Sequence, residues 1–189
     1  MSNSEYFNQL LRAMELLSDH PKSIFMGQGM FGGTTMSDTL RDVPKNKRLE
    51  MPVAEDLQLG IALGMSLDGL LPISVFPRWN FLACATNQLI NHLDRLSLYS
   101  EYRPKVIIRT AIPSSEPFDP GPQHDDDFTT AFCAMARTIK FVRLNKASMI
   151  IPAYESAVLS STSTVLVEYT EHYKDVRAVT AVVPPTAAA

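Results

Sequence analysis

Short apolar runs alternate with segments of helical periodicity along most of this chain. The runs at 71–76, 105–111 and 164–169 are rich in apolar and β-branched residues, as is typical of buried strands. Between them, apolar positions recur at helical spacing over 80–99 and 128–137. Strands that are joined through helices pair in parallel, and their helices lie on both faces of the sheet. The sequence therefore predicts an α/β fold, a three-layer sandwich with a mostly parallel sheet.

This alternation continues through residues 1–169 and stops there. A chain of 189 residues is long enough for one core and too short for two comfortable ones, so we expect 1–169 to form a single domain. No periodicity follows Thr170, and 170–189 is expected to be a C-terminal tail. Further strands are expected at 23–26, 48–51, 140–144 and 148–151, and further helices at 3–18 and 55–68.

Charge and apolar content limit the partners that the chain is expected to bind. Seventeen basic and twenty acidic residues give a formal charge of −3 without a basic block, so no nucleic-acid partner is expected. No apolar run approaches the roughly 20 residues of a membrane span, so no membrane partner is expected. Cys84 and Cys133 lie among apolar neighbours, which favours buried, reduced cysteines and a cytoplasmic location over a disulfide.

The most unusual residues of the chain follow the predicted strands. In open parallel sheets, ligands bind beyond the carboxyl ends of the strands. The loops that leave those ends are 27–35, 51–55, 76–81 and 111–127. Because all four loops meet at one edge of a parallel sheet, we expect a functional site there.

Glu55 lies at the expected start of a helix and has two interpretations. In one, its charge compensates the helix dipole, which stabilises a helix by about 0.3–1 kcal/mol. In the other, it is a carboxyl group in a partly apolar pocket that exchanges a proton near neutral pH. Asp56 could serve in either role if Glu55 does not. The pattern alone leaves both interpretations open.

Aromatic and acidic clusters occupy the two later loops. Phe76, Trp79 and Phe81 are either core residues or a wall on which a flat heterocycle stacks. His124 ends a proline-rich loop that could aim it into a cleft, the alternative being a surface or packed histidine. The aspartates at 125–127 are interpreted as the start of the next helix, or with His124 as the ligands of a metal-dependent hydrolase. Their spacing fits no strong metal motif, so no metal site is predicted.

Three segments occur in an order and spacing shared with one family. They are Pro52-Val-Ala-Glu-Asp-Leu-Gln-Leu-Gly, Phe76-Pro-Arg-Trp-Asn-Phe and Gln123-His124. Through them, residues 24–169 resemble the pyrimidine-binding domain of thiamine-diphosphate enzymes. The likeness is to the β-subunit of 2-oxoacid dehydrogenase E1 components and to the central domain of transketolases.

The resemblance assigns roles to four residues. Glu55 matches the glutamate that hydrogen-bonds N1′ of the aminopyrimidine in thiamine diphosphate, which prepares the cofactor to lose its thiazolium C2 proton. Phe81 matches the aromatic residue that stacks on the pyrimidine, and His124 matches a histidine that moves protons or orients the substrate. Gln28 stands in the turn where the family usually carries an acid beside the cofactor. The resemblance thus implies catalytic roles for Glu55 and His124, and cofactor binding by Glu55, Phe81 and Gln28.

The chain also departs from the family in ways that bear on its partners and substrate. It lacks the Gly-Asp-Gly and downstream Asn of the domain that binds the diphosphate and Mg²⁺. The resemblance therefore implies a separate diphosphate-binding subunit, in a hetero-oligomer or homodimer, that binds most of the Mg²⁺. The aspartates after His124 would repel an anionic 2-oxo acid, which leaves the substrate class open.

Two functions follow from this sequence. The first is the pyrimidine-binding subunit of a split thiamine-diphosphate enzyme that acts on a 2-oxo acid or a ketose, with Glu55 activating the cofactor. The second is a non-catalytic interaction module that has kept the fold and lost the chemistry, an alternative that Gln28 and the missing domain favour.

Overall fold

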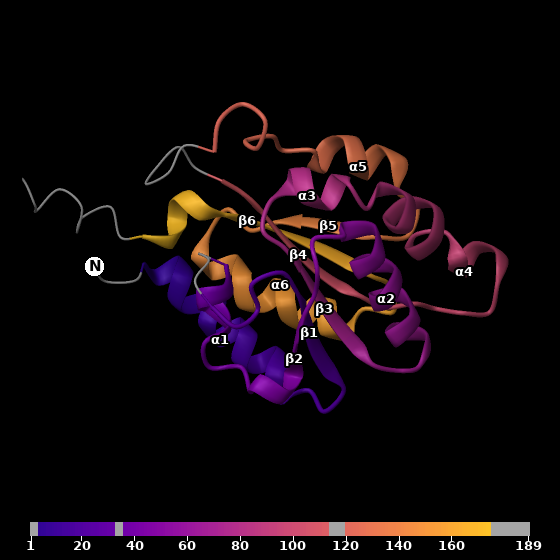
Figure 1. Ribbon diagram of the computed structural model, residues 1–189, viewed down its shortest axis with the longest axis horizontal. Helices are drawn as coiled ribbons and strands as arrows, with labels where there is room; N and C mark the ends of the chain where they lie inside the picture. Colours follow the sequence, from indigo (N-terminus) through magenta and orange to yellow (C-terminus); the bar gives the residue numbers. More distant parts are fainter. Residues whose placement is uncertain (1–3, 33–35, 114–119, 175–189) are drawn as a thin grey trace, which may run out of the picture.

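The computed structural model describes residues 4–32, 36–113 and 120–174, and its centre is one parallel sheet. The strand order is β2-β1-β3-β4-β6-β5, and every neighbouring pair runs in parallel (Figure 1). The sheet is therefore wholly parallel, where a mostly parallel one was predicted. The strands are β1 (Ser23–Gly27), β2 (Arg48–Glu50), β3 (Leu71–Phe76), β4 (Ile107–Ile112), β5 (Lys140–Arg143) and β6 (Thr164–Tyr169).

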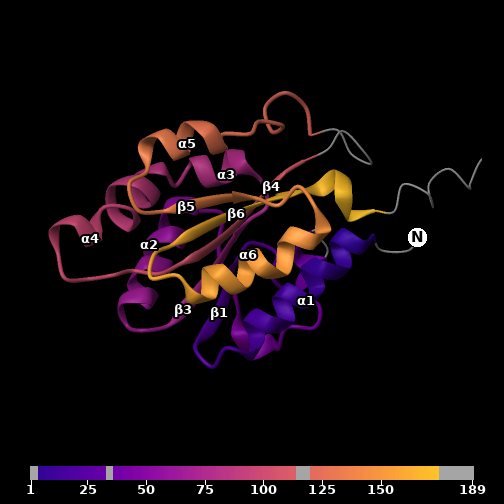
Figure 2. The ribbon, with the colours of Figure 1, turned by 180° about the vertical axis from the view of Figure 1, so that it is seen from behind.

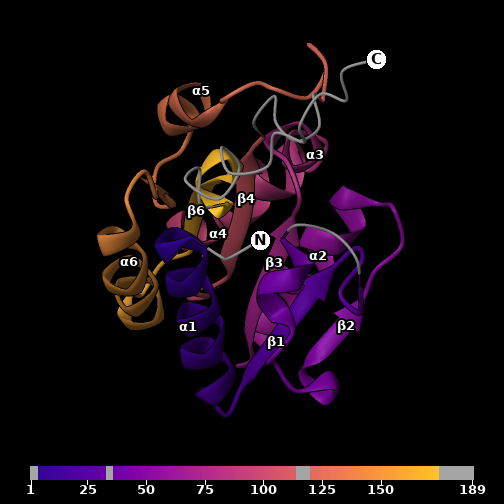
Figure 3. The same cartoon turned by 90° about the vertical axis from the view of Figure 1, so that its left-hand side faces the viewer.

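Helices cover both faces of the sheet, which confirms the predicted three-layer sandwich (Figure 3). On one face, α1 (Glu5–Asp19) packs beside α6 (Ala147–Leu159), as Figure 2 shows. The other face carries α2 (Glu55–Leu67), α3 (Trp79–Ala83) and α5 (Thr129–Met135). Short 3-10 helices are present at η1 (Ser37–Leu40), η2 (Lys45–Lys47) and η4 (Thr170–Tyr173).

Alternating strand residues build two cores, one on each face. Phe25 and Ile107 belong to the cluster under α1 and α6, whereas their neighbours Met26 and Ile108 belong to the cluster under α2 and α3. Successive strand side chains point to opposite faces, so a strand that is apolar throughout is buried on both sides. This is why the apolar runs of the sequence located the strands well.

The single long helix predicted over 80–99 is wrong. The chain forms α3, then a π-helix, η3 (Asn87–Leu93), and then α4 (Leu96–Tyr99). Asp94 lies between η3 and α4 and is buried, and its carboxylate accepts the backbone N–H groups of Arg137, Thr138 and Ile139. Apolar spacing does not reveal this polar anchor, since Leu89 and Leu93 before it are buried as an uninterrupted helix would bury them.

The strand predicted over 148–151 is also wrong, because these residues lie in α6. A short apolar run is compatible with either a strand or a buried helix, and length decides between them. Here the apolar positions continue as Ile150, Tyr154 and Ala157, which are all buried at helical spacing. The residues that indicate a helix therefore follow the apolar run at 148–151 and do not lie within it.

Both cysteines are free, as expected, but the prediction that they are buried is wrong. Cys84 and Cys133 are exposed. Their apolar neighbours Leu82, Ala85 and Phe132 are buried in the core. Each cysteine lies on the side of its segment that faces away from the core. No helix in the described residues is both long and apolar enough to cross a membrane.

A buried ionic network fixes β6 and the segment that follows it. Arg109 Nε lies 2.7 Å from Glu168 Oε1, and both side chains are fully buried. The hydroxyls of Tyr154 and Tyr173 also donate to the Glu168 carboxylate. Tyr173 lies in η4, so the first residues of the predicted tail pack against the domain, whereas 175–189 lie outside the described residues. Burial raises the pKa of both tyrosine hydroxyls, which stay protonated donors.

Candidate functional site

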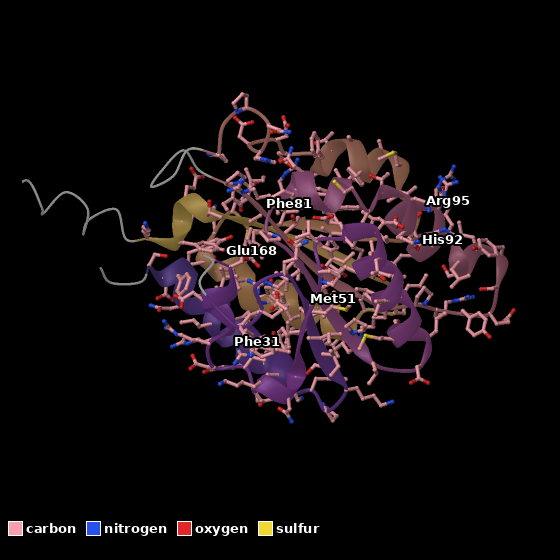
Figure 4. All side chains as sticks on the ribbon, in the orientation of Figure 1. Phe31, Met51, Phe81, His92, Arg95 and Glu168 are labelled. Carbon is pink, nitrogen blue, oxygen red and sulfur yellow. The ribbon has the colours of Figure 1, made fainter. Side chains whose placement is uncertain are left out.

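The residues predicted to be functional lie at the carboxyl edge of the sheet. Because all strands are parallel, the loops after β1, β2, β3 and β4 leave the sheet on the same side. In Figure 4, Phe81 and Glu168 lie toward this side, while His92 and Arg95 lie near α4 at the other end of the molecule. This is the edge at which open parallel sheets bind ligands.

The turn after β1 lies tight against β3. A Cβ atom at Gly27 would come within 2.6 Å of the Val75 carbonyl oxygen, so only glycine fits there. Gly29 has a φ of 68°, a left-handed conformation that favours glycine. The two glycines therefore let the backbone turn at the sheet edge and present the side chain between them, that of Gln28.

The carboxylate of Glu50 organises the same turn. Its Oε1 accepts the Gly29 N–H at 2.5 Å and its Oε2 accepts the Met30 N–H at 2.7 Å. Glu50 pairs with Gly27 in the parallel register of β1 and β2, which brings its side chain to the turn. The sequence analysis missed Glu50, although an acid at the last position of an edge strand beside a glycine turn could have signalled this role.

Glu55 is the first residue of α2, and its half-buried side chain faces this turn. Gln28 Nε2 donates a hydrogen bond to Glu55 Oε1 at 3.2 Å. Within the described residues no hydrogen bond reaches Glu55 Oε2. The structure thus brings together two of the predicted site residues, and it leaves one carboxylate oxygen of Glu55 available to a ligand.

Asp56, the alternative to Glu55, faces elsewhere. Its side chain is exposed, and its Oδ2 accepts the side-chain amide of Gln88 at 3.3 Å. Gln88 belongs to the π-helix η3, so Asp56 joins α2 to the neighbouring helix. Of the two acids at the start of α2, Glu55 is the one beside the turn.

The aromatic cluster after β3 divides into core and site residues. Phe76 and Trp79 are buried, and the Trp79 indole donates to Thr129 Oγ1 at 3.1 Å. Phe81 is only half-buried. Two of the three aromatic residues are therefore core, and Phe81 is the one whose ring is partly exposed at the site edge.

Phe81 and His124 lie together although they come from different loops. Their ring centroids are 5.4 Å apart with a tilt of 58°. The His124 N–H donates to the Gly121 carbonyl at 3.0 Å, and His124 Nδ1 is enclosed with no hydrogen-bond partner among the described residues. The end of the proline-rich loop thus holds the imidazole against Phe81.

The aspartates that follow His124 have separate partners. Asp126 accepts the Asn80 side-chain amide at 3.3 Å, and Asp127 accepts the Thr129 N–H at the start of α5. Burial opposes ionisation of Asp127, but hydrogen bonds from Thr129 and Arg143 outweigh it and lower its pKa. Within the described part of the chain, no three His, Cys, Asp or Glu side chains are placed to hold a metal ion.

The predicted residues form two pairs, Gln28 with Glu55 and Phe81 with His124. The first pair belongs to the ends of β1 and β2, and the second to the ends of β3 and β4. Because β1 is hydrogen-bonded to β3, the two pairs occupy neighbouring parts of one edge. Among the described residues, no hydrogen bond or ring contact joins one pair to the other.

Solved structures with the same fold include two from thiamine enzymology. One is a split-gene transketolase in an inactive β4 tetramer, with a TM-score of 0.67 and 16% identity over 87% of this chain. Another, from Mycobacterium smegmatis, is assigned as a thiamin diphosphate-dependent enzyme, with a TM-score of 0.61 and 17% identity over 92% of this chain. This chain spans 50% and 32% of their respective lengths. No protein-family model and no curated protein matches it. The chain has a transketolase-like fold.

Proposed function

We propose that this chain is the pyrimidine-binding subunit of a split thiamine-diphosphate enzyme that acts on a 2-oxo acid or a ketose. The observation that carries the proposal is the Gln28–Glu55 contact at the carboxyl edge of the sheet. The fold supports it, since the structures compared above include a transketolase and a protein assigned to thiamin diphosphate chemistry.

The polar side chains at this edge of the sheet fit the aminopyrimidine of thiamine diphosphate. Gln28 engages Oε1 of Glu55 and so fixes the plane of the carboxyl group, while Oε2 remains for a ring nitrogen. A carboxyl group in that position holds a proton at the nitrogen and passes it back. When bound, thiamine diphosphate supplies the reactive carbon, and the protein supplies orientation and proton transfer.

Phe81 and His124 would form the second half of the site. The half-buried ring of Phe81 offers a surface on which a flat heterocycle can stack. The unpartnered Nδ1 of His124 can accept or donate a proton according to its tautomer. In the proposed subunit, His124 therefore orients the substrate or moves its protons.

The proposed site needs a partner. In the proposed complex, a diphosphate-binding subunit supplies the groups that hold the diphosphate and Mg²⁺, which is the partner that the family resemblance implies. We place the complex in the cytoplasm, because both cysteines are free and exposed.

One observation favours a second candidate, a non-catalytic interaction module. Gln28 replaces the acid expected in the turn, and the transketolase compared above is described as an inactive β4 tetramer. Such a module could be a homodimer or a larger oligomer of this chain, and it would bind no cofactor.

Affinity capture from the native source separates the two functions. The first predicts recovery of a subunit with Gly-Asp-Gly and a downstream Asn, and saturable binding of thiamine diphosphate with Mg²⁺ by the reconstituted complex. Calorimetry of that complex with Glu55→Ala then measures the contribution of the carboxyl group. Recovery of only self-associated chain that binds no thiamine diphosphate would overturn the first function and support the second.

A further inference from the structure

Arg78 is a charged residue at the site edge to which no role has been assigned. It lies two residues after the end of β3 and is half-buried. Its guanidinium carbon lies over the ring of Phe81, 5.8 Å from the ring centroid. Among the described residues, its side chain makes no ion pair and no hydrogen bond.

Arg78 shares this isolation with the half-buried Arg95, whose Nε has no hydrogen-bond partner among the described residues, but Arg95 lies near α4, away from the site edge. Arg109 and Arg143 each pair with a carboxylate, and Arg41 lies near two aspartates. A guanidinium offers five N–H donors in a planar fork that matches carboxylate and phosphate groups. A half-buried fork without an acceptor is therefore suited to bind an anion from outside the chain.

His124 brings a second polar group to the same ring. It approaches Phe81 from the loop after β4, with 5.4 Å between the ring centroids. Its Nδ1 is enclosed and has no hydrogen-bond partner in the part of the chain that the structure describes. Arg78 and His124 thus come from two separate loops and meet at one aromatic ring.

The acids beside His124 are partly occupied by other contacts. Arg143 Nη2 lies 2.9 Å from Asp127 Oδ2, and Asn80 donates its amide to Asp126. These contacts offset part of the negative charge that otherwise opposes an anionic ligand. Asp125 remains exposed to solvent, where its field is screened.

We propose that Arg78, with His124, binds an anionic group, a carboxylate or a phosphate, of the molecule that enters this site. The identification of that molecule as the substrate rests on the function proposed above. Arg78 fixes the anion at the mouth of the site, and His124 completes its coordination beside Phe81.

Nuclear magnetic resonance of the histidine side chains tests the proposal on the full chain. The sequence has four histidines, so three of them serve as internal controls. Inorganic phosphate and acetate are titrated separately at constant ionic strength. We expect saturable shifts of the His124 signals with at least one of these anions. A response to phosphate alone identifies a phosphorylated ligand, and a response to acetate identifies a carboxylate.

Arg78→Gln should raise the half-saturating anion concentration at least about fivefold, because it removes a charged, bidentate donor. Arg78→Lys keeps the charge and should give an intermediate value. Arg41→Gln is a matched control, since Arg41 also lies over an aromatic ring, 5.9 Å from the centroid of Phe7, and should titrate as the wild type does. Circular dichroism verifies that each variant is folded.

The proposal is overturned if the His124 signals do not move, if all four histidines move alike, or if folded Arg78→Gln and Arg78→Lys both titrate like the wild type. Glu55→Gln separates this result from the proposed function, because it should leave the anion titration unchanged. Anion binding without thiamine-diphosphate binding in the complex would refute only the proposed function. Thiamine-diphosphate binding without anion binding would refute only the role of Arg78.

Discussion

Gln28 Nε2 donates a hydrogen bond to Glu55 Oε1 at 3.2 Å, and this contact joins the turn after β1 to the first residue of α2. A neutral amide therefore stands beside the carboxyl group that the account makes central. It can donate to Glu55 whether that group is ionised or protonated, provided that the proton is on Oε2. The neighbour thus fixes the orientation of Glu55 and adds no charge.

Gln28→Leu should weaken the action of Glu55 without unfolding the chain. Loss of this hydrogen bond costs about 0.5–1.5 kcal/mol with a neutral carboxyl group and up to about 3 kcal/mol with a charged one, which corresponds to roughly 2- to 160-fold in turnover of the assembled enzyme. Gln28→Glu is the complementary variant, because two neighbouring carboxylates share one proton and should change the pH profile. Steady-state rates across pH measure both effects. Wild-type rates and pH dependence in both variants would contradict this role of Gln28.

Glu50→Gln should loosen the glycine turn. The two carboxylate oxygens accept the Gly29 and Met30 N–H groups, and a glutamine offers one oxygen and an amide that donates. We expect amide hydrogen exchange at Gly29 and Met30 to accelerate about tenfold or more. Glu101→Gln changes an exposed acid and serves as the control. Equal exchange rates in the two variants would argue against the role of Glu50.

The buried pair of Arg109 and Glu168 predicts a large loss of stability in Glu168→Gln. Both side chains are fully buried, and the substitution leaves the Arg109 charge without its carboxylate. Breaking a buried pair in this way costs about 3–5 kcal/mol in the free energy of unfolding. Urea denaturation measures it, with Tyr173→Phe as a milder change of about 1 kcal/mol in the same network. A loss below about 1 kcal/mol in Glu168→Gln would contradict this account of the core.

Asp127 predicts a dependence on pH at the start of α5. Because hydrogen bonds from Thr129 and Arg143 outweigh burial, its pKa in the fold lies below the ordinary 3.8. The stability that it contributes is therefore present above that value and is lost as the pH falls through the lowered pKa. Arg143→Gln should raise the pKa of Asp127 in a carboxyl ¹³C titration. An unchanged titration would show that Arg143 does not hold this charge.

The sequence predicted the strands better than the polar anchors, for a physical reason. A strand buried on both faces, such as 71–76, is a predominantly apolar run in which only Ser74 is polar, and β3 has those bounds. By contrast, the partners of Asp94 are backbone N–H groups at 137–139, which are distant in sequence, so no spacing within 80–99 predicts this contact. The apolar run at 148–151 fits two structures, and only its tertiary packing selects α6.

The candidate site was partly predictable for a similar reason. Gln28, Glu55, Phe81 and His124 lie in recognisable segments at the ends of parallel strands, and the structure pairs them as Gln28 with Glu55 and Phe81 with His124. The role of Glu50 depends on a contact between β2 and the turn after β1, and the proposed role of Arg78 depends on His124, which comes to the same aromatic ring from another loop. No local spacing encodes such contacts, so only the fold brings these residues to the site.

The most direct test of the central claim is the exchange of the C2 hydrogen of thiamine diphosphate with deuterium in the reconstituted complex. If Glu55 moves the proton that activates the cofactor, Glu55→Gln should slow this exchange by about two powers of ten or more, while the variant stays folded and assembled. Exchange at the wild-type rate in a folded Glu55→Gln complex would contradict the role of Glu55 and the function built on it.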